Sequence, residues 1–186
     1  ILGILTLSTL PGIDQAFVQA VAAGKEGSLL STLKTKIRWG LLGSVGSLIF
    51  AFYYLANGNW TLFASFCVVA LFVPFMDSLT LYLDLLQGRR TFRTLTAFNT
   101  VSQVGATVII IGAIFFDPSA VVIVAAYVVS WTVIRGAFFL YSLKKLPPNQ
   151  ETEHTLSTYG KHLTIIKVAN TLGGSLGGIL VFHVLG

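Results

Sequence analysis

Charged residues are scarce in this chain of 186 residues: they make up 10% of it, whereas 54% of its residues are hydrophobic. Soluble domains carry about 25% charged residues. The scarcity excludes an ordinary soluble globular domain, and the mean hydropathy of +0.81 indicates a membrane protein instead.

Cysteine and catalytic motifs are also nearly absent. The single cysteine, Cys67, excludes an internal disulfide and a cysteine-based metal site, and we interpret it as a small packing residue in an apolar run. The sequence has no GxSxG, HExxH or Walker pattern and no paired histidine ligands. We therefore expect no enzyme activity, no metal and no cofactor.

Acidic residues number 7 against 12 lysines and arginines, which gives a net charge of +5. The basic residues flank apolar segments rather than forming one surface stripe. Contact with anionic membrane lipids therefore explains them better than binding to nucleic acid does.

Long apolar stretches are what the sequence has in abundance, and a helix needs about 20 residues to cross the hydrocarbon core. We expect an all-α polytopic membrane protein with six transmembrane helices, at 1–23, 39–57, 60–86, 95–116, 119–143 and 163–185. Short turns at 57–59 and 117–119 should join the second helix to the third and the fourth to the fifth.

The segments between these helices alternate in charge. The second and fourth contain no lysine or arginine, whereas the first, third and fifth contain ten of the twelve: Lys25, Lys34, Lys36, Arg38, Arg89, Arg90, Arg93, Lys144, Lys145 and Lys161. The positive-inside rule places these three segments in the cytoplasm and both chain ends on the outer side. We expect a multi-pass protein of the plasma (inner) membrane.

The fifth segment, 144–162, is polar and contains Pro147 and Pro148, which stop the preceding helix. We predict that it links two helical bundles. Residues 1–143 would then hold five helices of a first lobe, and 163–186 the first helix of a second. Because the chain starts inside an apolar run and stops without a polar tail, we expect it to be an internal fragment of a longer membrane protein.

Pro11, Gly12 and Asp14 interrupt the first apolar stretch. Pro11 has no N–H and clashes with the preceding turn, which predicts a kink or break in the helix. The Asp14 carboxylate could accept hydrogen bonds from the N–H groups that the break frees. Two interpretations stay open: a working hinge, or a plain proline kink with Asp14 as a local cap.

The third span carries a polar stripe after Pro74, which should bend the helix. Its members recur at helical spacing and are Asp77, Thr80, Asp84 and Gln87. Such a stripe should face water or another polar helix face rather than lipid. Asp84 is near enough to Arg89 and Arg90 for an interfacial ion pair, whereas Asp77 lies deeper.

Two other spans carry signals for helix–helix contact. In the fourth, four small or polar residues share one face: Asn99, Ser102, Gln103 and Ala106. In the sixth, two small-xxx-small pairs would let a neighbouring helix approach closely: Gly173 with Gly177, and Gly174 with Gly178. We interpret His183, near the outer end, as an interfacial residue.

Tyr127, Trp131 and Arg135 recur every four residues in the fifth span. Aromatic faces can stack on sugar rings, and a guanidinium group can bind phosphate through two parallel hydrogen bonds. The alternatives for Arg135 are snorkelling to the cytoplasmic surface, about 12 Å away, or pairing with an internal acid.

Four motifs resemble the bacterial polysaccharide flippases, of the multidrug/oligosaccharidyl-lipid/polysaccharide exporter superfamily. They are LPGIDQAFVQAVAAGKEGSL at the end of the first span, FYYL, QGRRTFR and STYGKHLT, in the order and at roughly the spacing of that family. Many relatives also carry an Asp-Lys pair in a pattern like LDKILVGHLLG. This sequence reads LGGILVFHVLG, so the role of that pair is not carried over.

The resemblance implies two lobes of about six helices around a central cavity, with this chain supplying helices two to seven. It also implies transport of an undecaprenyl-diphosphate-linked oligosaccharide across the plasma membrane by alternating access, for polysaccharide or lipopolysaccharide synthesis. The expected partners are the lipid-linked oligosaccharide, membrane lipids and polysaccharide assembly proteins.

For this function we expect Arg135 to bind the diphosphate and Trp131 and Tyr127 to contact sugar. A cation-coupled multidrug antiporter of the same superfamily is the alternative, with Asp14 or Asp77 as the ion site. The sign of the cavity charge should separate the two, because an acidic cavity favours cations. A non-transport membrane subunit of glycan synthesis, with Asp77 and Asp84 as catalytic acids, is a third hypothesis.

Overall fold

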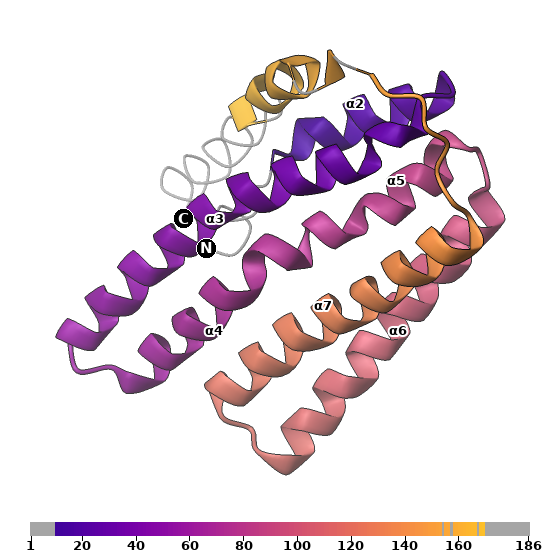
Figure 1. Cartoon of the computed structure of the whole chain (residues 1–186). Helices are drawn as coiled ribbons and strands as arrows, with labels where there is room; N and C mark the ends of the chain where they lie inside the picture. The colour runs from indigo at the N-terminus through magenta and orange to yellow at the C-terminus, as the bar shows by residue number, and fades with distance from the viewer. Residues whose placement is uncertain (1–9, 154, 157, 167, 170–186) are drawn as a thin grey trace, which may run out of the picture.

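The computed structural model describes residues 10–153, 155, 156, 158–166, 168 and 169, and within these ranges it contains helices and no strand. Figure 1 shows the long helices running side by side as a bundle. The helices are α2 (Pro11–Ala22), η2 (Glu26–Ser28), α3 (Leu29–Ala56), α4 (Trp60–Met76), η3 (Ser78–Thr80), α5 (Leu81–Gly88), α6 (Phe92–Phe116) and α7 (Ala120–Lys145). Residues 158–166 are also helical. The prediction of an all-α protein is confirmed.

Four helical stretches of the described chain are long and apolar enough to cross a membrane. They are Glu26–Ala56, Trp60–Gly88, Phe92–Phe116 and Ala120–Lys145. These four match the second to fifth predicted spans. The first span is described only from residue 10, and the glycine pairs and His183 of the sixth lie outside the described residues.

Helix α3 begins ten residues before the predicted start of the second span. It starts at Leu29, so Lys34, Lys36 and Arg38 lie inside the helix rather than in a connecting segment. No glycine or proline occurs from Leu29 to Trp39, and leucine, lysine and arginine are good helix formers. Hydropathy marks where a chain enters the apolar core, which is not where its helix begins.

The basic connections meet at one end of the bundle. The guanidinium of Arg89, in the α5–α6 turn, bonds Glu26 in the α2–α3 connection and the carbonyl oxygen of Pro147 in the segment after α7. The turns at 57–59 and 117–119, which have no lysine or arginine, lie at the opposite end (Figure 1). The charge alternation therefore corresponds to two distinct ends of one bundle.

The buried core of the described chain lies mainly between α2 and α5. The buried face of α2 includes Ile13 and Phe17, and α5 contributes Leu81 and Leu85 to the same cluster. Helix 158–166 packs on α2 at two glycines, because a Cβ on Gly12 would come 2.1 Å from the Thr164 backbone nitrogen. By contrast, α3 and α6 expose long apolar faces, as expected where lipid covers a helix.

Candidate functional site

The third span is interrupted two residues after Pro74. Helix α4 ends at Met76, the short turn η3 follows, and α5 continues the span. Pro74 cannot donate to the carbonyl of Ala70 one turn earlier, and the Ser44 hydroxyl of α3 donates to that carbonyl instead, at 2.6 Å. The bend predicted from Pro74 is thus present as a break, and α3 supplies a hydrogen bond that the break removes.

The carbonyl groups at this break receive donors from three directions. Arg135 of α7 donates to the carbonyl oxygen of Met76 at 2.7 Å. Lys36 of α3 and the Thr80 hydroxyl both donate to the carbonyl oxygen of Asp77, at 3.1 Å and 2.6 Å. Because unpaired backbone carbonyls are costly in an apolar interior, these donors stabilise a break that would otherwise be unfavourable.

Lys36 also forms an ion pair that the sequence analysis missed. Its ammonium nitrogen lies 2.5 Å from a carboxylate oxygen of Asp14, and its side chain is only 1% exposed. The sequence predicts Lys36 in a connecting segment, whereas it lies inside α3. The signal was its position on the small-residue face of α3, four residues before Gly40, since that face packs against other helices.

Asp77 and Arg135 form the second ion pair at the break. An Arg135 nitrogen lies 3.4 Å from the Asp77 carboxylate, and the guanidinium sits over the Trp131 ring, 4.5 Å from its centroid. The Tyr127 and Trp131 rings lie 6.4 Å apart, centroid to centroid. Of the alternatives considered for Arg135, the structure therefore shows pairing with an internal acid. Tyr127, Trp131 and Arg135 form one connected group along a face of α7.

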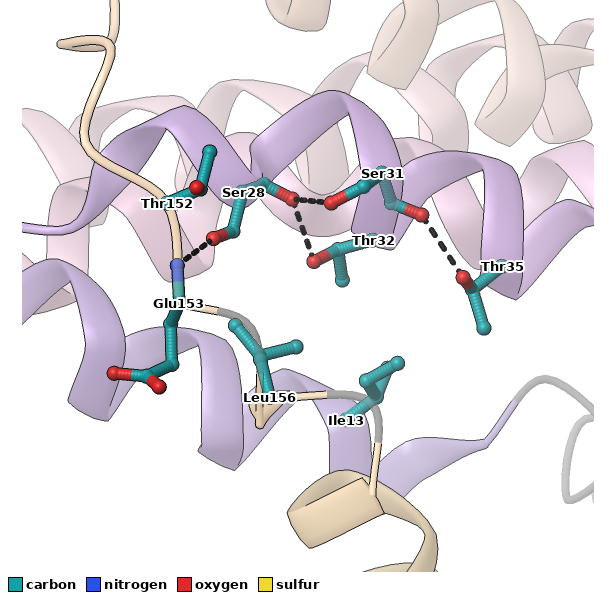
Figure 2. A pocket seen from close by; sticks show the side chains of 8 residues that line it. All are labelled: Ile13, Ser28, Ser31, Thr32, Thr35, Thr152, Glu153 and Leu156. Atoms are coloured by element: carbon teal, nitrogen blue, oxygen red, sulfur yellow. Dashed lines mark hydrogen bonds between the residues drawn. The ribbon is translucent and has the colours of Figure 1, made fainter.

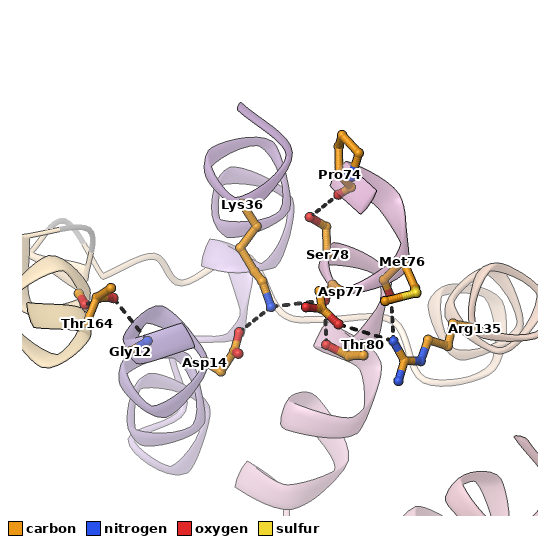
Figure 3. Close-up of polar contacts among 11 residues, drawn as sticks. Gly12, Asp14, Lys36, Pro74, Met76, Asp77, Ser78, Thr80, Arg135 and Thr164 are labelled. Atoms are coloured by element: carbon orange, nitrogen blue, oxygen red, sulfur yellow. Dashed lines mark hydrogen bonds and ion pairs between the residues drawn. The ribbon is translucent and has the colours of Figure 1, made fainter. Parts of the chain in front are cut away.

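These four charged residues form one ionic cluster, Asp14–Lys36–Asp77–Arg135, which joins α2, α3, the α4–α5 break and α7 (Figure 3). Asp77 follows Trp60 by 17 residues and Arg135 follows Ala120 by 15, so both lie about 23–26 Å from the helix ends opposite the basic end. In a hydrocarbon core about 30 Å thick, this depth would be near the surface at the basic end of the bundle.

Of the break predicted at Pro11, the described residues show one side, because the part of the first span before residue 10 lies outside them. Helix α2 begins at Pro11, and Leu10 before it has a left-handed backbone with φ of 57°. The Thr164 hydroxyl accepts from the N–H of Gly12 at 3.1 Å. A hinge motion at this position remains a prediction.

An open groove between α2 and α5 leads to the ionic cluster. Its volume is about 420 Å³, and its lining residues are Asp14, Gln15, Val18, Gln19, Asp84 and Gln87. The stripe predicted for the third span is thus divided: Asp84 and Gln87 face a polar side of α2, as expected, while Asp77 lies in the cluster. We call this feature the α2–α5 groove.

A second pocket, of about 360 Å³, lies where Thr152, Glu153 and Leu156 approach α3. Figure 2 shows that its hydroxyl groups are used internally: Ser31 and Thr32 donate to the carbonyl oxygen of Ser28, and the Ser28 hydroxyl accepts from the N–H of Glu153. This pocket therefore marks where the linker docks on α3.

Two ion pairs lie at the basic end of the bundle, and one of them, Lys25–Glu153, fastens the linker, to which Arg89 also donates a hydrogen bond at the Pro147 carbonyl. Arg89 binds both carboxylate oxygens of Glu26, at 2.6 and 2.5 Å, and Lys25 pairs with Glu153. Hydrogen bonds from Lys25 and Thr155 lower the pKa of the Glu153 carboxyl to about 2. Residues 146–153 of the predicted linker are thus irregular but anchored, whereas its last residues, 158–162, are helical.

The predicted polar face of the fourth span is only partly correct. Ser102 and Ala106 of α6 are buried, and the Ser102 and Tyr82 hydroxyls lie 3.4 Å apart. Asn99 and Gln103 are exposed instead. Only a narrow face of α6 packs on α5 and α7. Ser102 and Ala106 lie on that face, and Asn99 and Gln103 lie outside it.

The described residues contain no group of three or more histidine, cysteine, aspartate or glutamate side chains that could hold a metal ion. No family model, curated protein or solved structure matches this chain.

Proposed function

We propose that this chain is part of a membrane transporter that flips an undecaprenyl-diphosphate-linked oligosaccharide across the plasma membrane by alternating access. The support is the motif resemblance, the four apolar helices and the basic end of the bundle. In this proposal the basic end faces the cytoplasm and attracts the anionic lipid before transport.

The ionic cluster at the broken helix is the observation that carries the proposal. Charged residues in membrane helices are costly and mark substrate or ion pathways, and transporters commonly place them at interrupted helices. Arg135 and Lys36 each bind both a carboxylate and a backbone carbonyl at the break. An entering diphosphate would compete with Asp77 for Arg135 and so change the contacts of the broken helix.

The structure also gives one specific reason to keep the cation antiporter as a second candidate. The α2–α5 groove has two carboxylates, Asp14 and Asp84, and no lysine or arginine among its lining residues. An acidic groove favours a cation over a diphosphate. In the antiporter, Asp14 would exchange the Lys36 ammonium for a transported cation or proton.

Complementation of a bacterial strain that lacks its polysaccharide flippase tests the proposal. We expect the full-length protein to restore surface polysaccharide, and Arg135→Ala to abolish export while the protein still inserts and accumulates. Arg135→Lys should also be impaired, because an ammonium cannot replace a guanidinium that binds two groups at once.

Arg93→Ala is the matched control, since Arg93 is exposed near the start of α6, away from the cluster. It should export normally. Normal export by Arg135→Ala would contradict the role of Arg135. Failure of the wild-type protein to export glycan, together with resistance to organic cations, would instead favour the antiporter.

A further inference from the structure

The α2–α5 groove contains an unusual concentration of side-chain amides. Gln15 and Gln19 lie four residues apart on α2, and Gln87 faces them from α5. All three are exposed, and they lie between the basic end of the bundle and the buried Lys36. None of them belongs to the ionic cluster, so the proposed diphosphate contacts leave them without a role.

The size of the groove suits a small molecule rather than a bare ion. Its volume of about 420 Å³ falls in the range of small-molecule pockets, roughly 300–1,000 Å³. A bare ion needs only a few oxygen ligands held close together. The groove is open and its lining comes from two helices, which leaves room for a ring-sized group.

The hydrogen-bonding chemistry of the lining also favours a hydroxyl-rich ligand. An amide side chain both donates and accepts, as a sugar hydroxyl does, and a carboxylate accepts from hydroxyls. A cation would use only the oxygen acceptors and leave the amide N–H groups unused. Lys36 already balances the charge of Asp14 at 2.5 Å, and two carboxylates in the groove would repel a phosphate.

We propose that the α2–α5 groove binds a neutral saccharide unit of the transported lipid, with Gln15, Gln19 and Gln87 as the specificity residues. This inference rests on the proposed function and adds the location of the sugar. Asp14 connects the two parts, because it lines the groove and pairs with Lys36 of the ionic cluster. The sugar then lies beside the diphosphate contacts rather than on Trp131.

Binding of three lipids to the full-length protein in nanodiscs tests this inference. The probes are undecaprenyl diphosphate and the same lipid carrying one glucose or one N-acetylglucosamine. We expect at least one sugar-bearing lipid to bind about tenfold more tightly than undecaprenyl diphosphate. Gln15→Leu and Gln87→Leu should each reduce that difference about fivefold or more, with unchanged affinity for undecaprenyl diphosphate.

Gln103→Leu is the matched control, because Gln103 is exposed on α6 outside the groove. A second measurement uses Gln15→Cys: the sugar-bearing lipid should protect it from a water-soluble maleimide, and undecaprenyl diphosphate should not. If the wild type binds sugar-bearing lipids preferentially but the groove variants and the protection do not follow, the groove assignment is overturned while the proposed function stands. If no probe binds, the proposed function and this inference both fail. If the wild type binds ethidium and shows no preference for sugar-bearing lipids, and the groove variants lose ethidium binding, the groove is assigned to a cation instead.

Discussion

Lys36 needs partners for its charge, because its side chain is only 1% exposed. It has two: the Asp14 carboxylate and the carbonyl oxygen of Asp77. Arg135 repeats this arrangement from α7 with Asp77 and Met76. Each cation thus stabilises both an acid and an interrupted backbone.

Replacing Lys36 should therefore destabilise the protein even though it removes a buried charge. Lys36→Met leaves the partly exposed Asp14 without its cation and takes one donor from the Asp77 carbonyl, at a cost of about 2 kcal/mol. We expect a lower midpoint of thermal unfolding in detergent. Lys34→Met, on the exposed side of the same helix, should leave the free energy of unfolding within about 0.5 kcal/mol of wild type.

The double variant separates the ion pair from other effects of the substitution. If Asp14 and Lys36 are coupled, Lys36→Met combined with Asp14→Asn should be more stable than the sum of the two single losses predicts. Strict additivity would show that the two side chains act independently, against the ion pair seen in the structure.

At the scale of the elements, the contact between α3 and the break in the third span determines how this bundle is built. A Cβ on Gly40 would come 2.9 Å from the Cα of Pro74, so only glycine permits this approach. The approach in turn brings Ser44 to the Ala70 carbonyl and Lys36 to the Asp77 carbonyl. One small residue therefore sets the positions of two hydrogen bonds.

Gly40→Ala should push α3 away from α4. Because the atom in conflict belongs to the backbone of Pro74 rather than to a flexible side chain, we expect a loss of about 1–3 kcal/mol, measured as a lower unfolding midpoint. Gly112→Ala on α6 is the control: a Cβ there meets no atom within 4 Å, so alanine should be neutral or stabilise the helix by up to about 1 kcal/mol. Equal effects of the two variants would argue against the close contact.

At the scale of the whole molecule, the bundle has one end with basic connections and one end without them. Glu26, Arg89 and Pro147 come from three connections and meet at the basic end. Because the basic connections share one end, the positive-inside rule predicts the same orientation from each of them.

Cysteine labelling tests that orientation. Cysteines at Arg93 and Lys144 should be shielded from an impermeant thiol reagent in intact cells, whereas one at Asn57 should react. These positions are exposed, unlike Gly27, where a Cβ would come 2.8 Å from the backbone of Gln150. Labelling of Arg93→Cys from outside, without permeabilisation, would reverse the orientation.

The anchoring of the linker should depend on pH. The pKa of Glu153 falls from an ordinary 4.5 to about 2 in the folded chain, chiefly through its hydrogen bond with Lys25. Its contribution is therefore complete above pH 4.5 and is lost as the pH falls through about 2. Pepsin should cleave residues 146–153 faster in Glu153→Gln than in wild type at pH 4, and the ratio of the two rates should approach one near pH 2. A ratio that is the same at both pH values would contradict this assignment.

The sequence by itself determined the class of the protein and the positions near which proline begins or interrupts a helix. Composition is enough for the class because lipid selects apolar residues along a whole span. Pro74 predicted the break in the third span, and α2 begins at Pro11, because proline lacks the N–H that a helix interior needs. The alternating charge of the connections predicted which of them share an end, and the four-residue spacing of Tyr127, Trp131 and Arg135 predicted one connected face.

Only the tertiary structure decided which charges meet. Lys36 and Asp14 are 22 residues apart, and Asp77 and Arg135 are 58 apart, so no local pattern connects them. Their pairing depends on how closely helices approach at Gly40 and on where the third span is broken. The same holds for the start of α3, since a helix extends as long as its residues permit, whereas hydropathy reports only which part of it lipid would surround.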